Sequence, residues 1–199
     1  QVTAEVEWAE SADGARRAAH VALTTSAAPL SLPLLDGLDG ASWSDMRGRT
    51  RQAWGEPFVI DTLTIAGGAV ATVDVRHHVR AFFQGNRHLL QALTDDVTAR
   101  ATAAVVADLY AGVGLFSLIL AAQGRSVDAV EGDDWAAGDL QANAAPTGRV
   151  RVHHRPVEQF VQRTRLNDFG TIVVDPPRTG LSPIVSTALI GARVPRVVY

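Results

Sequence analysis

The second half of the sequence alternates short apolar runs with helical segments, and this alternation constrains the fold more than any other feature. The apolar runs are Ala104–Leu109, Ser126–Val130, Val150–His154, Thr171–Val174 and Arg196–Tyr199. Each is short and rich in apolar, mostly β-branched residues, as is typical of a buried strand. Strands that alternate with helices form a parallel sheet with right-handed crossovers. The sequence therefore predicts an α/β fold of the doubly wound, Rossmann-like type.

The segments between these runs carry helix start and stop signals. Helices are predicted at Leu115–Gln123, from Asp133 or Asp134 to about Ala144, at Val157–Arg163 and from Pro183 to about Gly191. Gly124 ends the first of them, and Pro156 suits the start of the third. Ser182 can cap the last, with Pro183 as its first residue. The local signals thus agree with the strand pattern.

The first 86 residues show a different pattern. Strands are predicted at Val2–Trp8 and Ala18–Thr24, and as a hairpin around Gly67-Gly68 at Phe58–Ile65 and Ala69–Val75. Residues 29–54 are rich in Pro, Gly, Ser and Asp, so we expect a loop there with at most short helices. We predict a small, mostly antiparallel α+β subdomain over residues 1–86. A Rossmann-like domain over 87–199 would follow, beginning with a linking helix within Arg87–Thr102 and truncated after its fifth strand.

Composition excludes several kinds of chemistry. All 18 basic residues are Arg, so mechanisms that need a lysine are excluded, and the absence of cysteine excludes disulfides, thiolate zinc sites and iron–sulfur clusters within these residues. The formal net charge of -3 gives no global attraction to nucleic acid, although a local basic patch remains open. Val105–Ala122 is apolar but contains Asp108 and two glycines, which favours a strand, a turn and a helix over a membrane span. With no signal-peptide pattern, we expect a cytoplasmic protein without a membrane partner.

A glycine turn follows the first predicted strand of the parallel sheet. Gly112 and Gly114 allow a ligand to approach the backbone closely, and Ser117 stands where a dinucleotide fingerprint has a third glycine. Glu131 lies 19 residues after Gly112, at the end of the second strand, where its carboxylate can accept both hydroxyls of a ribose. This combination suits S-adenosylmethionine, whose ribose needs an acceptor and which has no phosphates. The alternative is a tight turn between packed elements.

A second motif, Asp175-Pro176-Pro177-Arg178, follows the fourth strand. Ligands of an open α/β sheet bind beyond the carboxyl ends of its strands, which is where Asp175 is predicted to lie. The prolines fix the backbone and leave carbonyls free to accept from a flat polar substrate. Arg178 can bind a phosphate or a carboxylate. A proline-stiffened loop with a solvated arginine is the alternative.

Three motifs together resemble those of the S-adenosylmethionine-dependent RNA uracil-C5 methyltransferases, which make 5-methyluridine in tRNA and rRNA. The motifs are Phe82-Phe83-Gln84-Gly85-Asn86, Asp108–Phe116 and Asp175–Leu181. The resemblance covers about Ala81 to Tyr199. It is most specific in the third motif, because adenine-N6 and cytosine-N4 methyltransferases have an aromatic residue where this chain has Arg178.

The resemblance implies S-adenosylmethionine as cofactor and tRNA or rRNA as partner. It implies that the cofactor-binding residues are Gln84, Tyr110, Gly112, Gly114, Glu131 and Asp175. From their chemistry, we expect Asp175 and Pro176 to bind the edge of a flipped uracil, Arg178 to bind a phosphate and Phe82 to stack on a base. Gln84 as a linker residue and Tyr110 as a core aromatic remain alternatives. No metal site is expected, because His153 and His154 alternate on a strand and cannot both face one ion, and no iron–sulfur cluster is expected, because cysteine is absent.

The chain also departs from the family. Ala111 replaces the usual cysteine of the cofactor loop, which we interpret as a packing variant. In the family, a segment like Val197–Tyr199 continues into a motif whose cysteine is the nucleophile, and an RNA-binding β-barrel precedes the rest. We therefore expect a piece of a longer enzyme, with no catalytic residue of its own, that binds cofactor without turnover. A methyltransferase for another substrate and a noncatalytic cofactor- or RNA-binding module are the alternatives.

One basic cluster stands out locally. Arg76-His77-His78-Val79-Arg80, with Arg87 and His88, adjoins the aromatic pair Phe82-Phe83. It is interpreted either as a contact for RNA backbone and a stacked base or as a solvated strand face.

Overall fold

A computed structural model describes residues 4–24, 31, 33–65 and 72–199. Its largest sheet has the strands β7 (Val105–Leu109), β8 (Ser126–Glu131), β9 (Val150–His154), β10 (Thr171–Val174) and β11 (Val197–Val198). They lie in the order β11-β10-β7-β8-β9, and every neighbouring pair is parallel. This is the predicted doubly wound α/β fold. The strand order reverses between β7 and β10, which is where such sheets open a crevice for a ligand.

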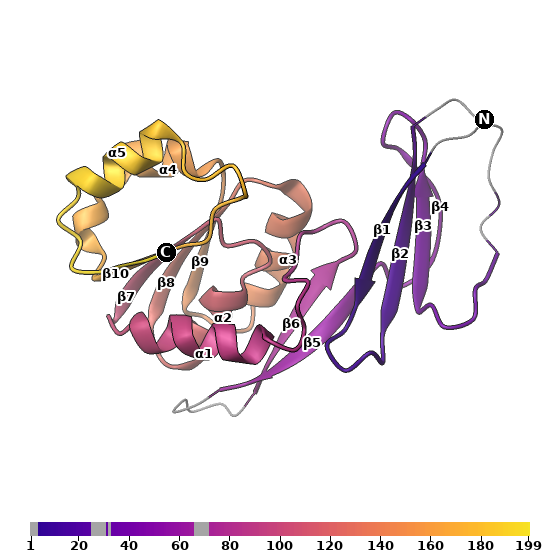
Figure 1. The fold of residues 1–199 in the computed structure, drawn as a ribbon, viewed down its shortest axis with the longest axis horizontal. Coiled ribbons are helices and arrows are strands. Elements are labelled where there is room, and N and C mark those ends of the chain that lie inside the picture. The colour runs from indigo at the N-terminus through magenta and orange to yellow at the C-terminus, as the bar shows by residue number, and fades with distance from the viewer. Residues whose placement is uncertain (1–3, 25–30, 32, 66–71) are drawn as a thin grey trace.

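Helices cover both faces of this sheet (Figure 1). The helices are α1 (Leu90–Arg100), α2 (Leu115–Ala122), α3 (Asp134–Ala144), α4 (Val157–Arg163) and α5 (Pro183–Gly191), with a short 3-10 turn at Leu166–Asp168. Asp133 caps α3 by accepting from the Ala136 N–H at 2.8 Å, and Ser182 caps α5. Among the described residues, no helix is long and apolar enough to cross a bilayer.

Successive strand residues enter opposite cores. Val173 points into a core with α1 and α2, whereas Ile172 and Val174 join a second core with α4 and α5. Both faces are buried at the centre of the sheet, so β7 and β10 are mostly apolar and easy to predict, whereas β9 at the edge is polar and only partly buried.

A β-hairpin packs beside the parallel sheet. It pairs β5 (Phe58–Thr64) with β6 (Thr72–His78), and the predicted turn at Gly67-Gly68 and the predicted strand start at Ala69 lie outside the described residues. Leu63 and Val75 share a core with α1 and α2, and β6 also packs against α3. The division into domains over 1–86 and 87–199 therefore stays a prediction, since residues on both sides of that boundary share one core.

The remaining strands form a separate sheet, seen at the right of Figure 1. Its order is β1 (Ala4–Glu10), β2 (Arg17–Leu23), β3 (Gly40–Ser44) and β4 (Thr50–Gly55). The β1–β2 and β3–β4 pairs are antiparallel and β2–β3 is parallel.

The prediction of a loop over residues 29–54 is wrong where β3 and β4 form. All five residues of β3 are buried, so the strand shows no alternation of polar and apolar residues. Its glycine permits close packing instead of a turn, because a Cβ on Gly40 would lie 2.0 Å from the carbonyl oxygen of Glu56. A Cβ on Gly55 would likewise collide with the backbone of Asp39.

Polar contacts join this sheet to the hairpin. The Asp61 carboxylate on β5 accepts from the backbone N–H of Ala12, in the β1–β2 turn. Arg80 pairs with Glu7 of β1 at 3.4 Å. Within the sheet, buried His20 lies between the hydroxyls of Ser42 and Ser44, at 2.6 and 3.0 Å.

Candidate functional site

A cavity of about 760 Å³ lies at the carboxyl ends of β7, β8 and β10. Its walls come from residues 80–84, the turn after β7, the start of α3 and the loop after β10. Every predicted site residue except Gly114 lines it, namely Phe82, Gln84, Tyr110, Gly112, Glu131, Asp175, Pro176 and Arg178. The fold thus brings together residues from three distant motifs at the edge where the strand order reverses.

Glu131 fastens the glycine turn to the end of β8. One carboxylate oxygen accepts from the Gly112 N–H at 2.8 Å, and the other accepts from Gly132 and Asp133 at 2.7 Å each. A carboxylate offers about four acceptor positions, so about one remains for a ligand. Glu131 can therefore take one hydroxyl fully, and a second only by sharing an oxygen that a backbone N–H already uses.

The two glycines of the turn have different tasks. Both adopt positive φ, 56° at Gly112 and 97° at Gly114. Gly112 borders the cavity with open space at its Cβ position, whereas a Cβ on Gly114 would lie 2.6 Å from Leu140 Cδ1. Gly114 is therefore a packing residue beneath the turn.

Tyr110 is strained and lies at the border of the site. Its φ of 63° makes it the one described non-glycine residue with positive φ, a conformation that costs energy and is enriched at functional sites. Its side chain lines the cavity and also packs against the core of α4 and α5. Both interpretations of this tyrosine, as cofactor neighbour and as core aromatic, thus describe part of its surroundings.

Gln84 and Asp175 meet across the cavity mouth. The Gln84 side-chain amide donates to Asp175 Oδ2 at 3.0 Å. The surrounding protein raises the pKa of Asp175 by removing water from it, and the bond from Gln84 opposes this rise. The Gln84 side chain therefore bonds another predicted site residue, whereas the linker interpretation predicted a bond to the backbone.

Asp108 is a buried carboxyl group that begins the second motif but was not among the predicted site residues. Ser117 donates to its Oδ2 at 2.6 Å, and its Oδ1 has no hydrogen-bond partner among the described residues. Burial raises the pKa of Asp108 to about 7, assisted by the negative charges of Asp175 and Glu131 and opposed by the bond from Ser117. A polar residue inside an otherwise apolar strand was the available signal.

Residues 76–80 of the basic cluster do not form a solvated strand face, whereas Arg87 and His88 of the same cluster are exposed. His77 and His78 are buried, stacked on Phe83 and Trp135 respectively. Burial lowers the pKa of His78 to about 4, with help from the charge of Arg80. The flanking arginines are held too: Arg76 pairs with Asp139 at 3.0 Å, and Arg80 with Glu7. The segment packs between neighbouring secondary-structure elements, and sequence spacing alone could not reveal its burial.

His153 and His154 have separate acidic partners. His153 bonds Asp128 at 2.5 Å and His154 bonds Asp134 at 3.2 Å. No group of three or more potential metal ligands is found in the part of the chain that the structure describes.

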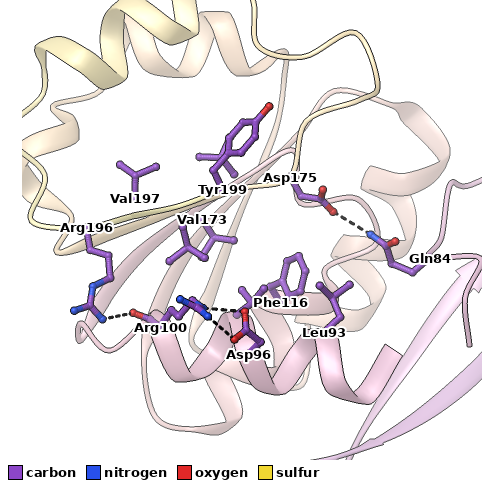
Figure 2. A pocket seen from close by; sticks show the side chains of 13 residues that line it. Gln84, Leu93, Asp96, Arg100, Phe116, Val173, Asp175, Arg196, Val197 and Tyr199 are labelled. Carbon is purple, nitrogen blue, oxygen red and sulfur yellow. Dashed lines mark hydrogen bonds and ion pairs between the residues drawn. The ribbon is translucent and has the colours of Figure 1, made fainter. Parts of the chain in front are cut away.

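A larger cavity of about 880 Å³ adjoins the first between α1 and the β10–β11 edge (Figure 2). The two share Gln84, Phe116 and Asp175. Its far wall holds the Asp96–Arg100 ion pair at 2.8 Å, and Arg196 donates to the Arg100 carbonyl at 2.6 Å. We place the candidate site in the smaller cavity because the glycine turn and Glu131 lie there.

Comparison with known proteins agrees with this geometry. No family model matches the chain. The tRNA (uracil(54)-C(5))-methyltransferase of Pyrococcus horikoshii is 29% identical over 154 residues, which are 76% of this chain and 35% of that protein. The 23S rRNA (uracil(747)-C(5))-methyltransferase of Pyrococcus abyssi is 31% identical over 143 residues, 72% of this chain and 34% of that protein. Over this part, the chain is homologous to RNA uracil-C5 methyltransferases. It spans about a third of the length of these curated relatives.

Solved structures of methyltransferases share the fold of this chain. The crystal structure of the Pyrococcus abyssi tRNA (uracil-54, C5)-methyltransferase with S-adenosyl-L-homocysteine superposes with a TM-score of 0.70 and 23% identity, over 92% of this chain and 45% of that one. A Thermus thermophilus 16S rRNA N2 G1207 methyltransferase gives 0.51 at 25% identity, over 69% and 40%. The resemblance inferred from the motifs is confirmed, and so is the methyltransferase fold.

Proposed function

We propose that this chain supplies the cofactor-binding part of an RNA uracil-C5 methyltransferase that acts on tRNA or rRNA. S-adenosylmethionine would occupy the cavity of about 760 Å³. The observation that carries this proposal is the convergence of the motifs 82–86, 108–116 and 175–181 on that one cavity. The names of the relatives agree with it.

The turn suits this cofactor better than it suits a dinucleotide. A pyrophosphate needs free N–H groups at a glycine turn. Here the Gly112 N–H donates to Glu131 at 2.8 Å, and the Gly114 N–H donates to the Ala111 carbonyl at 2.9 Å. S-adenosylmethionine has no phosphate, and its ribose can use the acceptor position that remains on Glu131.

Charge around the cavity points the same way. Glu131, Asp133 and Asp175 line it together with Arg80 and Arg178, so acidic residues outnumber basic ones by one. Acidic groups that converge on one site create a negative potential, which attracts a cation. S-adenosylmethionine carries a sulfonium, an ammonium and a carboxylate group, so its positive charges outnumber its negative one.

The uracil would enter at the mouth of the same cavity. Phe82 is 77% exposed there and offers a face on which an extruded base can stack. Asp175 and the Pro176 carbonyl can accept from the edge of the base, and Arg178 can bind a phosphate of the RNA.

These residues lack one part of the chemistry. Uracil C5 is a weak nucleophile until a thiolate adds to C6, and a base must then remove the C5 proton. The 199 residues contain no cysteine. We therefore propose that they bind the cofactor but do not by themselves methylate uracil.

Calorimetric titration of the chain with S-adenosylhomocysteine tests the proposal. We expect binding in the wild type and at least tenfold weaker binding in Glu131→Gln, because a hydrogen bond to a charged acceptor is worth about 1.5–3 kcal/mol. Glu56→Gln is the matched control, since Glu56 is exposed and lies outside the cavity. Circular dichroism establishes that each variant is folded. A folded wild type that takes up no S-adenosylhomocysteine contradicts the proposal.

A further inference from the structure

A third cavity opens between β1 and the start of α1. It has a volume of about 670 Å³ and shares Phe83 and Gln84 with the candidate site. Its outer wall is formed by Trp8 of β1 and by Asn86, Arg87 and His88. We call it the Trp8 cleft. Gln84, which bonds Asp175, therefore lines both cavities.

Trp8 offers this cleft an aromatic surface. Its side chain is 53% exposed, although β1 pairs with β2 along its whole length. An indole at a concave surface provides a large flat face at low conformational cost, and every nucleobase can stack on it.

The opposite wall is fixed in place by buried groups. The Phe83 ring stacks on His77 with 4.0 Å between the ring centroids and 12° between the planes. His77 bonds Asp61 at 2.8 Å, and Asp61 also accepts the Ala12 N–H. Because His77 and Asp61 are both buried, the position of Phe83 is determined by the fold and does not depend on a ligand.

The polar groups of the cleft suit a nucleotide. Arg87 pairs with Glu10 at 3.4 Å and buried Asp61 bonds His77 at 2.8 Å, so both acidic groups that line the cleft have partners within it. Arg87 and His88 are exposed and can meet a phosphate. The amides of Gln84 and Asn86 can both donate and accept, as the edge of a base requires.

We propose that the Trp8 cleft binds one unstacked nucleotide of the RNA whose uridine enters the candidate site. This inference rests on the proposed function. An RNA strand that leaves the candidate site past Phe83 and Gln84 reaches the cleft directly, because both residues line both cavities. The base stacks on Trp8, and the phosphate lies by Arg87 and His88.

The test uses a short fluorescein-labelled single-stranded RNA with one central uridine flanked by adenosines, and fluorescence anisotropy as readout. Trp8→Leu should weaken binding about fivefold or more, because stacking of a base on an aromatic side chain is worth about 1–3 kcal/mol. Trp8→Phe should recover most of the affinity. Val6→Ala is the matched control, since Val6 lies two residues away on β1, is 66% exposed and is outside the cleft.

A second readout identifies stacking directly. In the same RNA, 2-aminopurine replaces one adenosine beside the uridine, and its fluorescence should be quenched by the wild type but not by Trp8→Leu. The inference is overturned if the wild type does not bind the RNA, if Trp8→Leu binds it like Val6→Ala, or if 2-aminopurine is quenched equally by the wild type and Trp8→Leu. Titration with S-adenosylhomocysteine separates the two proposals, because Trp8→Leu should leave that affinity unchanged.

Discussion

The Gln84 amide donates to Asp175 Oδ2 at 3.0 Å, and this bond joins two motifs that lie 91 residues apart in the sequence. Gln84 also borders all three cavities. It therefore lies between the proposed cofactor site, the cavity of about 880 Å³ beside β11 and the Trp8 cleft.

Loss of this bond should be visible in the titration of Asp175. Because the bond from Gln84 lowers the pKa of that carboxyl group, Gln84→Ala should raise the pKa of Asp175 further above its ordinary value. NMR titration of the ¹³C-labelled aspartate carboxyl groups measures it. Gln141→Ala, at an exposed position on α3, is the control and should leave the pKa of Asp175 unchanged.

Asp108 should make stability depend on pH in a defined direction. Its pKa rises from 3.8 when unfolded to about 7 when folded, so its contribution is fully present below pH 3.8 and is lost as the pH rises towards 7. Asp108→Asn keeps a partner for Ser117 without this loss. The free energy of unfolding of Asp108→Asn relative to wild type should increase between about pH 4 and 7, by on the order of 3–4 kcal/mol, and stay constant above.

Urea denaturation over this pH range measures that difference. Taking the difference cancels the other titrating groups that both proteins share. A flat difference between pH 4 and 7 would show that the carboxyl group is ionised in the folded protein at all these values.

His20 should have the opposite effect on stability. Burial, with a smaller contribution from the charge of Arg80, lowers its pKa from 6.5 to about 4. Its contribution is therefore fully present above pH 6.5 and is lost as the pH falls towards 4. His20→Gln should lack this loss, so the wild type should lose up to about 3 kcal/mol relative to the variant between pH 6.5 and 4. Denaturation curves at several pH values provide the measurement, and parallel pH profiles would refute the prediction.

The two turn glycines should tolerate alanine unequally. Gly114→Ala places a Cβ 2.6 Å from Leu140 Cδ1 at a φ of 97°, whereas Gly112→Ala meets open space at a φ of 56°. We expect Gly112→Ala to cost about 1 kcal/mol from backbone strain and Gly114→Ala about 2–4 kcal/mol, since overpacking adds to it. Thermal unfolding followed by circular dichroism measures both. Equal melting temperatures would mean that Leu140 repacks without cost.

The parallel sheet could be predicted because its signals are local. A strand such as Thr171–Val174, buried on both faces, is an unbroken apolar run, and a cap such as Asp133 acts within its own turn. The motifs also predicted which residues line the candidate site, because the carboxyl ends of parallel strands meet at one edge. The roles of those residues in binding stay predictions.

What could not be predicted depends on distant partners. Gly40 and Gly55 look like turn residues until their strands lie side by side, where each leaves room for a backbone segment of the other hairpin arm. His77 looks like part of a basic surface until Asp61 and Phe83 enclose it. In both cases the residue type fits two different environments, and only the tertiary contacts decide between them.

The three N–H groups on Glu131 also have a thermodynamic consequence. They order the turn after β7 and the start of α3 while the chain folds, before any ligand is present. The conformational entropy of those residues is therefore lost during folding and does not reduce the affinity for a cofactor. A ligand that replaces one of these N–H groups at a Glu131 oxygen must break the hydrogen bond between them. Tight binding therefore favours ligands that bond the carboxylate while its hydrogen bonds to the backbone stay intact.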